Sequence, residues 1–186
     1  QSYRMDANIT LNNLTVTGKT DAPVQDATLS LMISPLVLNG SLSLANASSF
    51  LNSNNINVSI KGNFNNNGTY TYGTNLTTFN GGIQSITGTS LTSFYDLDVL
   101  SLTSLTVNNN FTVNRNLTIS NGNLILGSNR LTLLGNIINN GSYTDNNSTG
   151  GIALSGNSQQ QVSGTGSFGL LDLNNINGAR LYSDIN

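Results

Sequence analysis

A unit of about 75 residues recurs along this chain, and the recurrence restricts the folds that the chain can adopt. The copies are built almost wholly from Asn, Thr, Ser, Gly, Leu, Ile and Val. The matching segments are Gly62-Asn63 with Gly135-Asn136, Asn67-Gly68 with Asn140-Gly141, Tyr70-Thr71 with Tyr143-Thr144, Gln84-x-Ile86-x-Gly88 with Gln160-x-Val162-x-Gly164, and Phe94-x-x-Leu97-Asp98-Val99 with Phe168-x-x-Leu171-Asp172-Leu173. A long-period repeat of short segments predicts stacked units, each of which covers the apolar face of the next.

Within each unit the apolar residues alternate with polar ones over very short distances. Between Leu97 and Leu133 they come as pairs separated by one polar residue. The pairs are Leu97/Val99, Leu105/Val107, Phe111/Val113, Leu117/Ile119, Leu124/Leu126 and Leu131/Leu133. Period-two alternation predicts strands with one buried face, and the Asn, Gly and Ser residues between the pairs are typical of turns.

Three such segments span about 20 residues, which matches one coil of a parallel β-helix. We therefore expect Leu97, Leu117 and Ile137 to lie in one inward column, with Val99 beside Ile119 in another. The predicted fold is all-β, a right-handed parallel β-solenoid of about eight coils, with about four coils in each unit. No α-helix is expected, and stacked Asn side chains are expected to form hydrogen-bonded ladders along the turns.

The whole chain, residues 1–186, is predicted to be one solenoid domain, because stacked repeats share a continuous core. Residues 36–186 form the regular repeats, and residues 1–35 form an irregular N-terminal part that could hold a cap or an insertion. Pro23 and Pro35 both fall in that part, and proline cannot donate to a strand ladder. Because the sequence stops partway into a repeat, the natural polypeptide or its family is expected to continue beyond Asn186.

Partial copies of the unit also occur in the first third of the chain. They pair Leu38, Leu42 and Leu44 with Val113, Leu117 and Ile119, pair Asn54, Ile56 and Val58 with Asn129, Leu131 and Leu133, and pair Leu11-x-x-Leu14-Thr15-Val16 with Phe94-x-x-Leu97-Asp98-Val99.

Composition excludes several functional classes. Eight acidic residues face six basic ones, giving a net charge of −2, so nucleic acid is not expected as a partner. Cysteine and histidine are absent, which removes disulfides, thiolate and imidazole metal sites, and ordinary catalytic triads. No stretch is long and apolar enough for a membrane-spanning helix. We predict no catalytic, cofactor-binding or metal-binding residues, no cofactor, and no enzymatic activity.

Asp96 and Asp98 are the one close acidic pair within a predicted strand. If Leu97 and Val99 point inward, both carboxylates point outward on the same face, with Arg115 near them one coil later. Such a pair could belong to a polysaccharide-cleaving or calcium site. These sites need several carboxylates gathered from neighbouring coils, which this face lacks. A solvated strand face with an Asp–Arg pair is the simpler interpretation.

Threonine runs and aromatic residues suggest two further surfaces. The runs at 14–17 and 70–72 invite an ice-binding interpretation, but the Thr positions do not repeat regularly from coil to coil. The aromatic residues Tyr70, Tyr72, Phe79, Phe94, Tyr95 and Tyr143 could form a surface on which sugars stack. Because Phe94 and Phe168 recur with the unit, core packing is the favoured role for those two.

Two phrases of the sequence resemble a known family. Phe79-Asn80-Gly81, Gln84-x-Ile86-x-Gly88 and Phe94-Tyr95-Asp96-Leu97-Asp98-Val99 are similar to the "FNG…QxIxG…FYNLxV" phrase of repeat-rich surface proteins of Bacteroidota. The likeness covers about residues 36–175. Such proteins are large cell-surface adhesins, among them gliding-motility adhesins exported by the type IX secretion system. The resemblance implies export and a surface role, and it transfers no catalytic residues.

Together these observations predict a structural repeat or stalk segment of a secreted, surface-attached bacterial adhesin. The expected partners are further repeats of the same polypeptide, the secretion machinery or outer-membrane attachment proteins, and surface glycans; the expected location is extracellular. Two alternatives remain open at this point. One is a carbohydrate-binding or carbohydrate-cleaving β-helix, and the other is a subunit of an extracellular fibre that stacks end to end through open strand edges.

Overall fold

The computed structural model describes residues 1–146 and 149–182, and all regular structure in those ranges is β-strand. The strands are β1 (Ser2–Met5), β2 (Thr10–Leu11), β3 (Leu14–Val16), β4 (Ala27–Leu31), β5 (Leu36–Leu38), β6 (Leu42–Leu44), β7 (Ser49–Asn52), β8 (Val58–Ile60), β9 (Phe64–Asn66), β10 (Thr69–Thr71), β11 (Leu76–Phe79), β12 (Ile83–Thr87), β13 (Thr92–Phe94), β14 (Asp96–Val99), β15 (Ser104–Val107), β16 (Phe111–Val113), β17 (Leu117–Ile119), β18 (Asn123–Gly127), β19 (Arg130–Leu133), β20 (Ile137–Asn139), β21 (Ser142–Asp145), β22 (Gly151–Leu154), β23 (Gln160–Ser163), β24 (Leu171–Leu173) and β25 (Ala179–Leu181).

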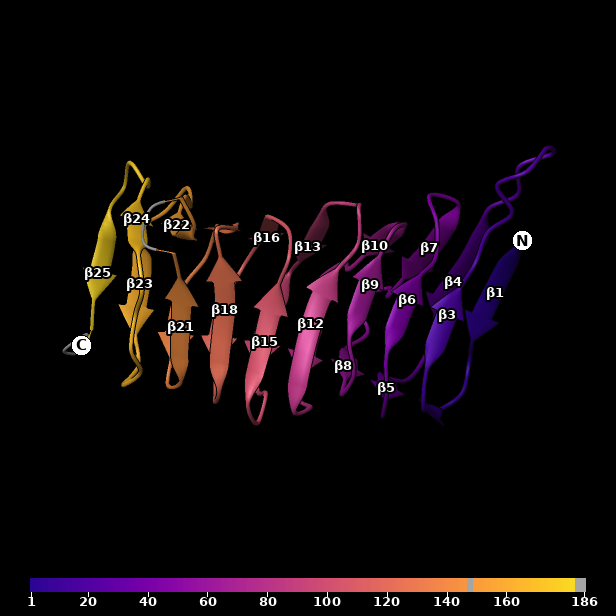
Figure 1. Ribbon diagram of the computed structural model, residues 1–186, viewed down its shortest axis with the longest axis horizontal. Helices are drawn as coiled ribbons and strands as arrows, with labels where there is room; N and C mark the ends of the chain where they lie inside the picture. The colour runs from indigo at the N-terminus through magenta and orange to yellow at the C-terminus, as the bar shows by residue number, and fades with distance from the viewer. Residues whose placement is uncertain (147–148, 183–186) are drawn as a thin grey trace.

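The strands form four sheets in which every neighbouring pair is parallel. Sheet 1 has the order β2-β5-β8-β11-β14-β17-β20-β23-β25, and sheet 2 has the order β3-β6-β9-β12-β15-β18-β21. The third side is divided into sheet 3 (β1-β4-β7-β10) and sheet 4 (β13-β16-β19-β22-β24). Because the chain visits these three sides in turn, it winds into the predicted parallel β-solenoid, with eight steps between the nine strands of sheet 1 (Figure 1).

The inward columns confirm the prediction from the period-two pattern. Leu97 pairs with Leu117 and Leu117 pairs with Ile137, each step being 20 residues. Val99 pairs with Ile119 in the neighbouring column. The first column continues in both directions through sheet 1 with side chains that are at most 1% exposed: Leu36, Val58, Thr77, Leu97, Leu117, Ile137 and Val162. One core therefore runs through these coils without interruption.

The length of the repeating unit in coils differs from the expected four. Gln84 lies in β12 of sheet 2, whereas its equivalent Gln160 lies in β23 of sheet 1, eleven strands later. With three strands per coil, eleven strands make three complete coils and two further sides. Likewise β6 belongs to sheet 2 and its equivalent β17 to sheet 1. Each copy of the unit is therefore rotated by one side of the solenoid relative to the copy before it.

Despite this rotation, the local structure of the two copies is the same around the repeated glutamine. The Gln84 side chain accepts a hydrogen bond from the Gly81 N–H at 2.7 Å and donates to the carbonyls of Ile60 and Gly62. Gln160 makes the corresponding three bonds, one to an amide and two to carbonyls of the preceding coil. Both side chains are 1% exposed. Buried turns need such partners for their backbone groups, which accounts for a glutamine at this place in each copy.

An aromatic cluster fills the core where the third side changes from sheet 3 to sheet 4. The Phe94 ring lies edge-on to those of Phe64, Tyr70, Phe79 and Phe111, with centroids 6.1–6.5 Å apart. The neighbouring strands β10 and β13 belong to different sheets at this level. The predicted core role of Phe94 is confirmed, and most of the aromatic residues considered for a sugar-stacking surface are instead buried.

The N-terminal part contains both regular strands and a protruding loop. Strand β1 pairs in parallel with β4, and β2 and β3 pair with β5 and β6. The irregular stretch lies between β3 and β4, where Lys19 and Gln25 form an isolated antiparallel bridge around Pro23. Pro35 lies immediately before β5 and outside the strand. Both prolines thus occupy positions at which no ladder bond from their nitrogen is required.

Candidate functional site

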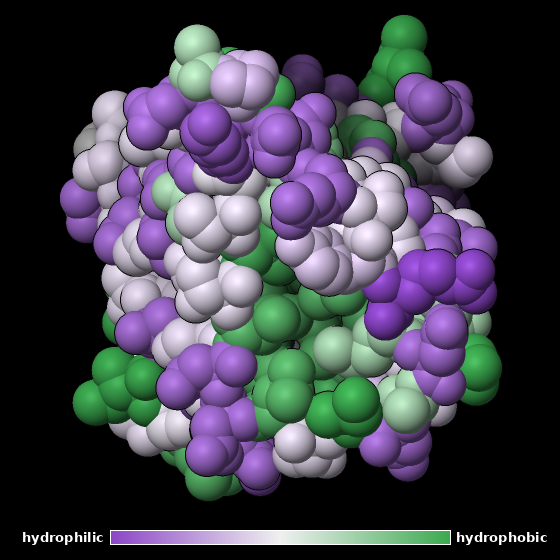
Figure 2. All heavy atoms as spheres, turned by 90° about the vertical axis from the view of Figure 1, so that its right-hand side faces the viewer, coloured by the Kyte–Doolittle hydropathy of each residue, from purple (hydrophilic) through white to green (hydrophobic). Residues whose placement is uncertain are grey.

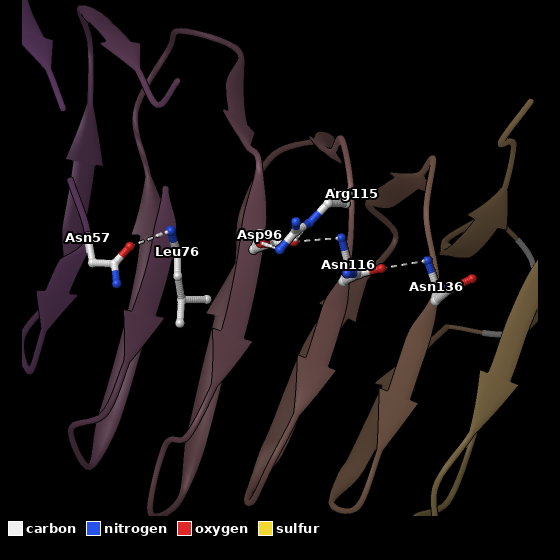
Figure 3. A network of polar contacts seen from close by, with 6 residues as sticks. All are labelled: Asn57, Leu76, Asp96, Arg115, Asn116 and Asn136. Carbon is white, nitrogen blue, oxygen red and sulfur yellow. Dashed lines mark hydrogen bonds and ion pairs between the residues drawn. The ribbon is translucent and has the colours of Figure 1, made fainter. Parts of the chain in front are cut away.

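A column of asparagines lines the turn that leads into sheet 1. The Asn57 Oδ1 atom accepts a hydrogen bond from the backbone N–H of Leu76, one coil later, at 2.9 Å. Asn116 Oδ1 accepts from the Asn136 N–H at 3.1 Å in the same way (Figure 3). Turn amides of this kind have no strand ladder to bond with, so the side chain supplies the missing acceptor.

The same arrangement occurs at other turns of the solenoid. Side-chain oxygens accept from the next coil's backbone in the pairs Asn13 with Ser41, Asn63 with Ser85, Asn67 with Thr89, Asn110 with Arg130, and Asn136 with Gln161. In each pair the side chain belongs to the earlier coil and the amide to the later one. The asparagine ladders predicted from the sequence therefore connect side chain to backbone, and they point in one direction along the axis.

Asp96 occupies a position in this column that asparagine fills elsewhere. Its Oδ1 atom accepts from the Asn116 N–H at 3.0 Å and from Arg115 Nε at 2.8 Å, and its Oδ2 atom bonds to Arg115 Nη2. The guanidinium also lies 4.9 Å from the centroid of the Tyr95 ring. This hydrogen bond with Asp96 raises the pKa of the Arg115 guanidinium. The predicted Asp–Arg pair is present, but Asp96 is only 8% exposed, so the expected solvated position is wrong for this residue.

Asp98 has different neighbours. It points outward from sheet 1 in register with Thr78 and Thr118, and its Oδ1 atom accepts from Ser120 Oγ at 2.8 Å. The two carboxylates are thus bound by separate donors, and both oxygens of Asp96 are occupied. Within residues 1–146 and 149–182 there is no group of three or more His, Cys, Asp or Glu that could hold a metal ion. An acid–base pair of the kind used by glycosidases is not assembled by Asp96 and Asp98.

The outer face of sheet 1 carries a shallow groove of about 190 Å³. Its lining residues are Asn116, Thr118, Asn136, Ile138, Gln161 and Ser163. No charged side chain lines this groove, and Ile138 is 46% exposed at its centre. Sites for drug-sized ligands usually hold about 300–1,000 Å³. The groove therefore offers amide and hydroxyl contacts to a neutral polar surface, without enclosing a ligand.

The largest hollow, of about 420 Å³, lies at the N-terminal end of the solenoid. Tyr3, Met5, Leu14, Val16 and Leu29 are among the residues that line it. Figure 2 shows this end, with apolar side chains gathered in its centre and polar ones around the rim. The hollow is the inner face of the first coil, which no earlier strand covers. It is a cross-section of the core, and it carries no polar group arranged for chemistry.

The fold and these surfaces define a neutral parallel β-solenoid whose polar side chains are used mainly to join one coil to the next. The described part of the chain contains no helix long and apolar enough to cross a membrane. Comparison with protein-family models, curated proteins and solved structures finds no match. The glutamines Gln84 and Gln160 and the asparagine columns are the residues whose roles the sequence did not assign, although the recurrence of both was visible in it.

Proposed function

We propose that this protein is a structural repeat or stalk segment of a secreted, surface-attached bacterial adhesin. The observation that supports the proposal is the single core that passes without a break from Leu36 to Val162 along sheet 1. In such an arrangement each coil contacts only its neighbours, so length can be added without changing the fold. The resemblance of the repeats to Bacteroidota surface adhesins adds export by type IX secretion and a role in gliding motility to this proposal.

The character of the surface supports weak and repeated contacts. Charged residues make up 8% of the chain, and the outer groove of sheet 1 is lined by amides, hydroxyls and Ile138. Neutral polar groups of this kind form individually weak hydrogen bonds with glycans or with other proteins. Many identical weak sites on one stalk can nevertheless hold a surface firmly, because linkage raises the effective concentration of each. The proposed partners are further repeats, secretion or outer-membrane attachment proteins, and surface glycans.

A series of proteins carrying one, two and three tandem units tests the proposal. Adhesion of coated beads to bacterial and polysaccharide surfaces should rise more than in proportion to the number of units. The variant Asp98→Ala should adhere as the parent does, because that carboxylate contacts only Ser120 among its recorded side-chain partners. Asp98→Asn is the matched control, since it keeps the acceptor oxygen and removes the charge.

Two results would contradict the stalk proposal. One is adhesion by a single unit that equals that of three units and is lost in Asp98→Ala. The other is release of reducing sugar from polysaccharides by the purified protein. Either result would assign the function to a carbohydrate site on the outer face of sheet 1, which the amide-lined groove beside Thr118 and Ile138 would then extend.

A further inference from the structure

The two strands at the C-terminal end are copies of strands that are covered elsewhere in the molecule. Strand β24 repeats the phrase found in β14, and β25 repeats β15. In sheet 1, β14 is covered on its C-terminal side by β17, with Leu97 against Leu117 and Val99 against Ile119. Among the described residues, no strand follows β24 in sheet 4 or β25 in sheet 1. The end of the solenoid therefore repeats a surface for which the molecule itself shows the cover.

Exposure of equivalent side chains measures what is missing. Val99 in β14 is 0% exposed, whereas the equivalent Leu173 in β24 is 65% exposed. Val107 in β15 is 2% exposed, whereas the equivalent Leu181 in β25 is 60% exposed. These side chains are aliphatic in both copies, so the difference comes from the absent neighbour and not from a change to a surface residue. An apolar strand edge left open in this way readily accepts another strand.

The internal copies also specify the chemistry of the covering strand. β17 covers β14 with Leu117-Thr118-Ile119, and β6 covers the more distant copy β3 with Leu42-Ser43-Leu44. In both places the strand is parallel, has two inward aliphatic residues, and has a hydroxyl residue between them. Both covering strands come from the same point in the 75-residue unit. The edge thus matches the beginning of another unit, entered at the residue equivalent to Val113.

We propose that the edge formed by β24 and β25 is an interface for a tandem copy of the unit, which joins it in parallel and continues both sheets. This inference rests on the proposed role as a repeat segment and identifies the partner of that segment. Because one unit spans eleven strands, the added copy begins one side further round the solenoid than the copy before it. A second whole chain does not offer this match, since its first coil begins with β1 to β3 and not with the equivalents of β16 and β17.

The test is a longer protein in which residues 113–186 are appended directly after Asn186. Hydrogen exchange is measured by mass spectrometry for the amides of Leu171–Leu173 and Ala179–Leu181 in the parent and in the extended protein. We expect these amides to exchange at least about tenfold more slowly in the extended protein, because covered strands open less often than edge strands. The matched control carries L117N and I119N in the appended copy alone, and it should exchange at the parental rate in β24.

Three outcomes would overturn the inference. The β24 amides could exchange at the parental rate while the appended strands are protected, or the whole extension could remain unprotected. Sedimentation could also show that the parent chain forms filaments at rising concentration, which would assign the edge to a second chain. Loss of adhesion in an extended protein whose β24 amides are protected would instead reject the stalk function and leave this interface in place.

Discussion

Tyr70 and Tyr143 occupy equivalent positions in two copies of the unit, and their hydroxyl groups have opposite surroundings. The Tyr70 Oη atom lies 2.9 Å from Thr77 Oγ1 and accepts from Asn75 Nδ2 at 2.7 Å. Thr77 belongs to the inward column of sheet 1, so this phenol satisfies a hydroxyl that would otherwise be buried without a partner. The substitution Tyr70→Phe should therefore lower the free energy of unfolding by about 1–3 kcal/mol.

The Tyr143 hydroxyl is buried as well, but it has no hydrogen-bond partner among the described residues. Its side chain is 2% exposed, and its ring lies edge-on to Phe168 with centroids 6.1 Å apart. Phenylalanine at this position keeps the ring contact and removes the cost of the unpaired hydroxyl. Tyr143→Phe should leave the protein unchanged or more stable, by up to about 1 kcal/mol.

The two variants are compared by urea unfolding followed by far-ultraviolet circular dichroism, with the parent measured alongside. Each removes one oxygen atom from an equivalent side chain, so each serves as the control for the other. The midpoints should separate by the equivalent of about 2 kcal/mol, with similar slopes. Equal losses in the two variants would refute the reasoning, because they would show that the Tyr143 hydroxyl also has a stabilising partner.

Two further predictions concern the strand faces and the response to alkaline pH. Leu117→Asp should cost at least about 3 kcal/mol, and far more than Thr118→Asp, because it places a carboxylate in the core column; similar thermal melts would mean that the assigned faces are reversed. Burial raises the pKa of the Tyr70 phenol to about 12 from its usual 10.0. The unfolded chain therefore loses this proton first, so stability present below pH 10 should fall as the pH rises towards about 12. Urea midpoints across this range should fall less in Tyr70→Phe than in the parent, and identical profiles would contradict the assignment.

The strand faces and the vertical columns were predictable because they depend on local pattern alone. An inward residue on each side of Thr118 fixes the face of β17, and a spacing of 20 residues places Leu117 over Leu97. A single shift by one residue would have moved every aliphatic side chain to the solvent. The sequence therefore contained enough information to define the coil and its core.

The side on which each copy lies was not predictable, because it depends on counting every strand between the copies. The step from Ile137 to Val162 in sheet 1 takes 25 residues, where earlier steps take 20. Strand lengths alone do not indicate whether such an insertion adds a side or only lengthens a loop. The burial of Asp96 was missed for a related reason, since Arg115 reaches it from the next coil and not from its own strand.

The direction of the asparagine bonds gives the solenoid a growing end. Asn57, Asn116 and Asn136 each hold an acceptor for an amide that lies later in the chain. A coil that has already folded therefore presents a template to the next, whereas the later coil offers its predecessor only the donor. A chain that emerges with its N-terminus first, from a ribosome or through a membrane channel, would meet these acceptors in the order in which it needs them. Folding in that order would proceed coil by coil, and each added coil would hinder the chain from sliding back.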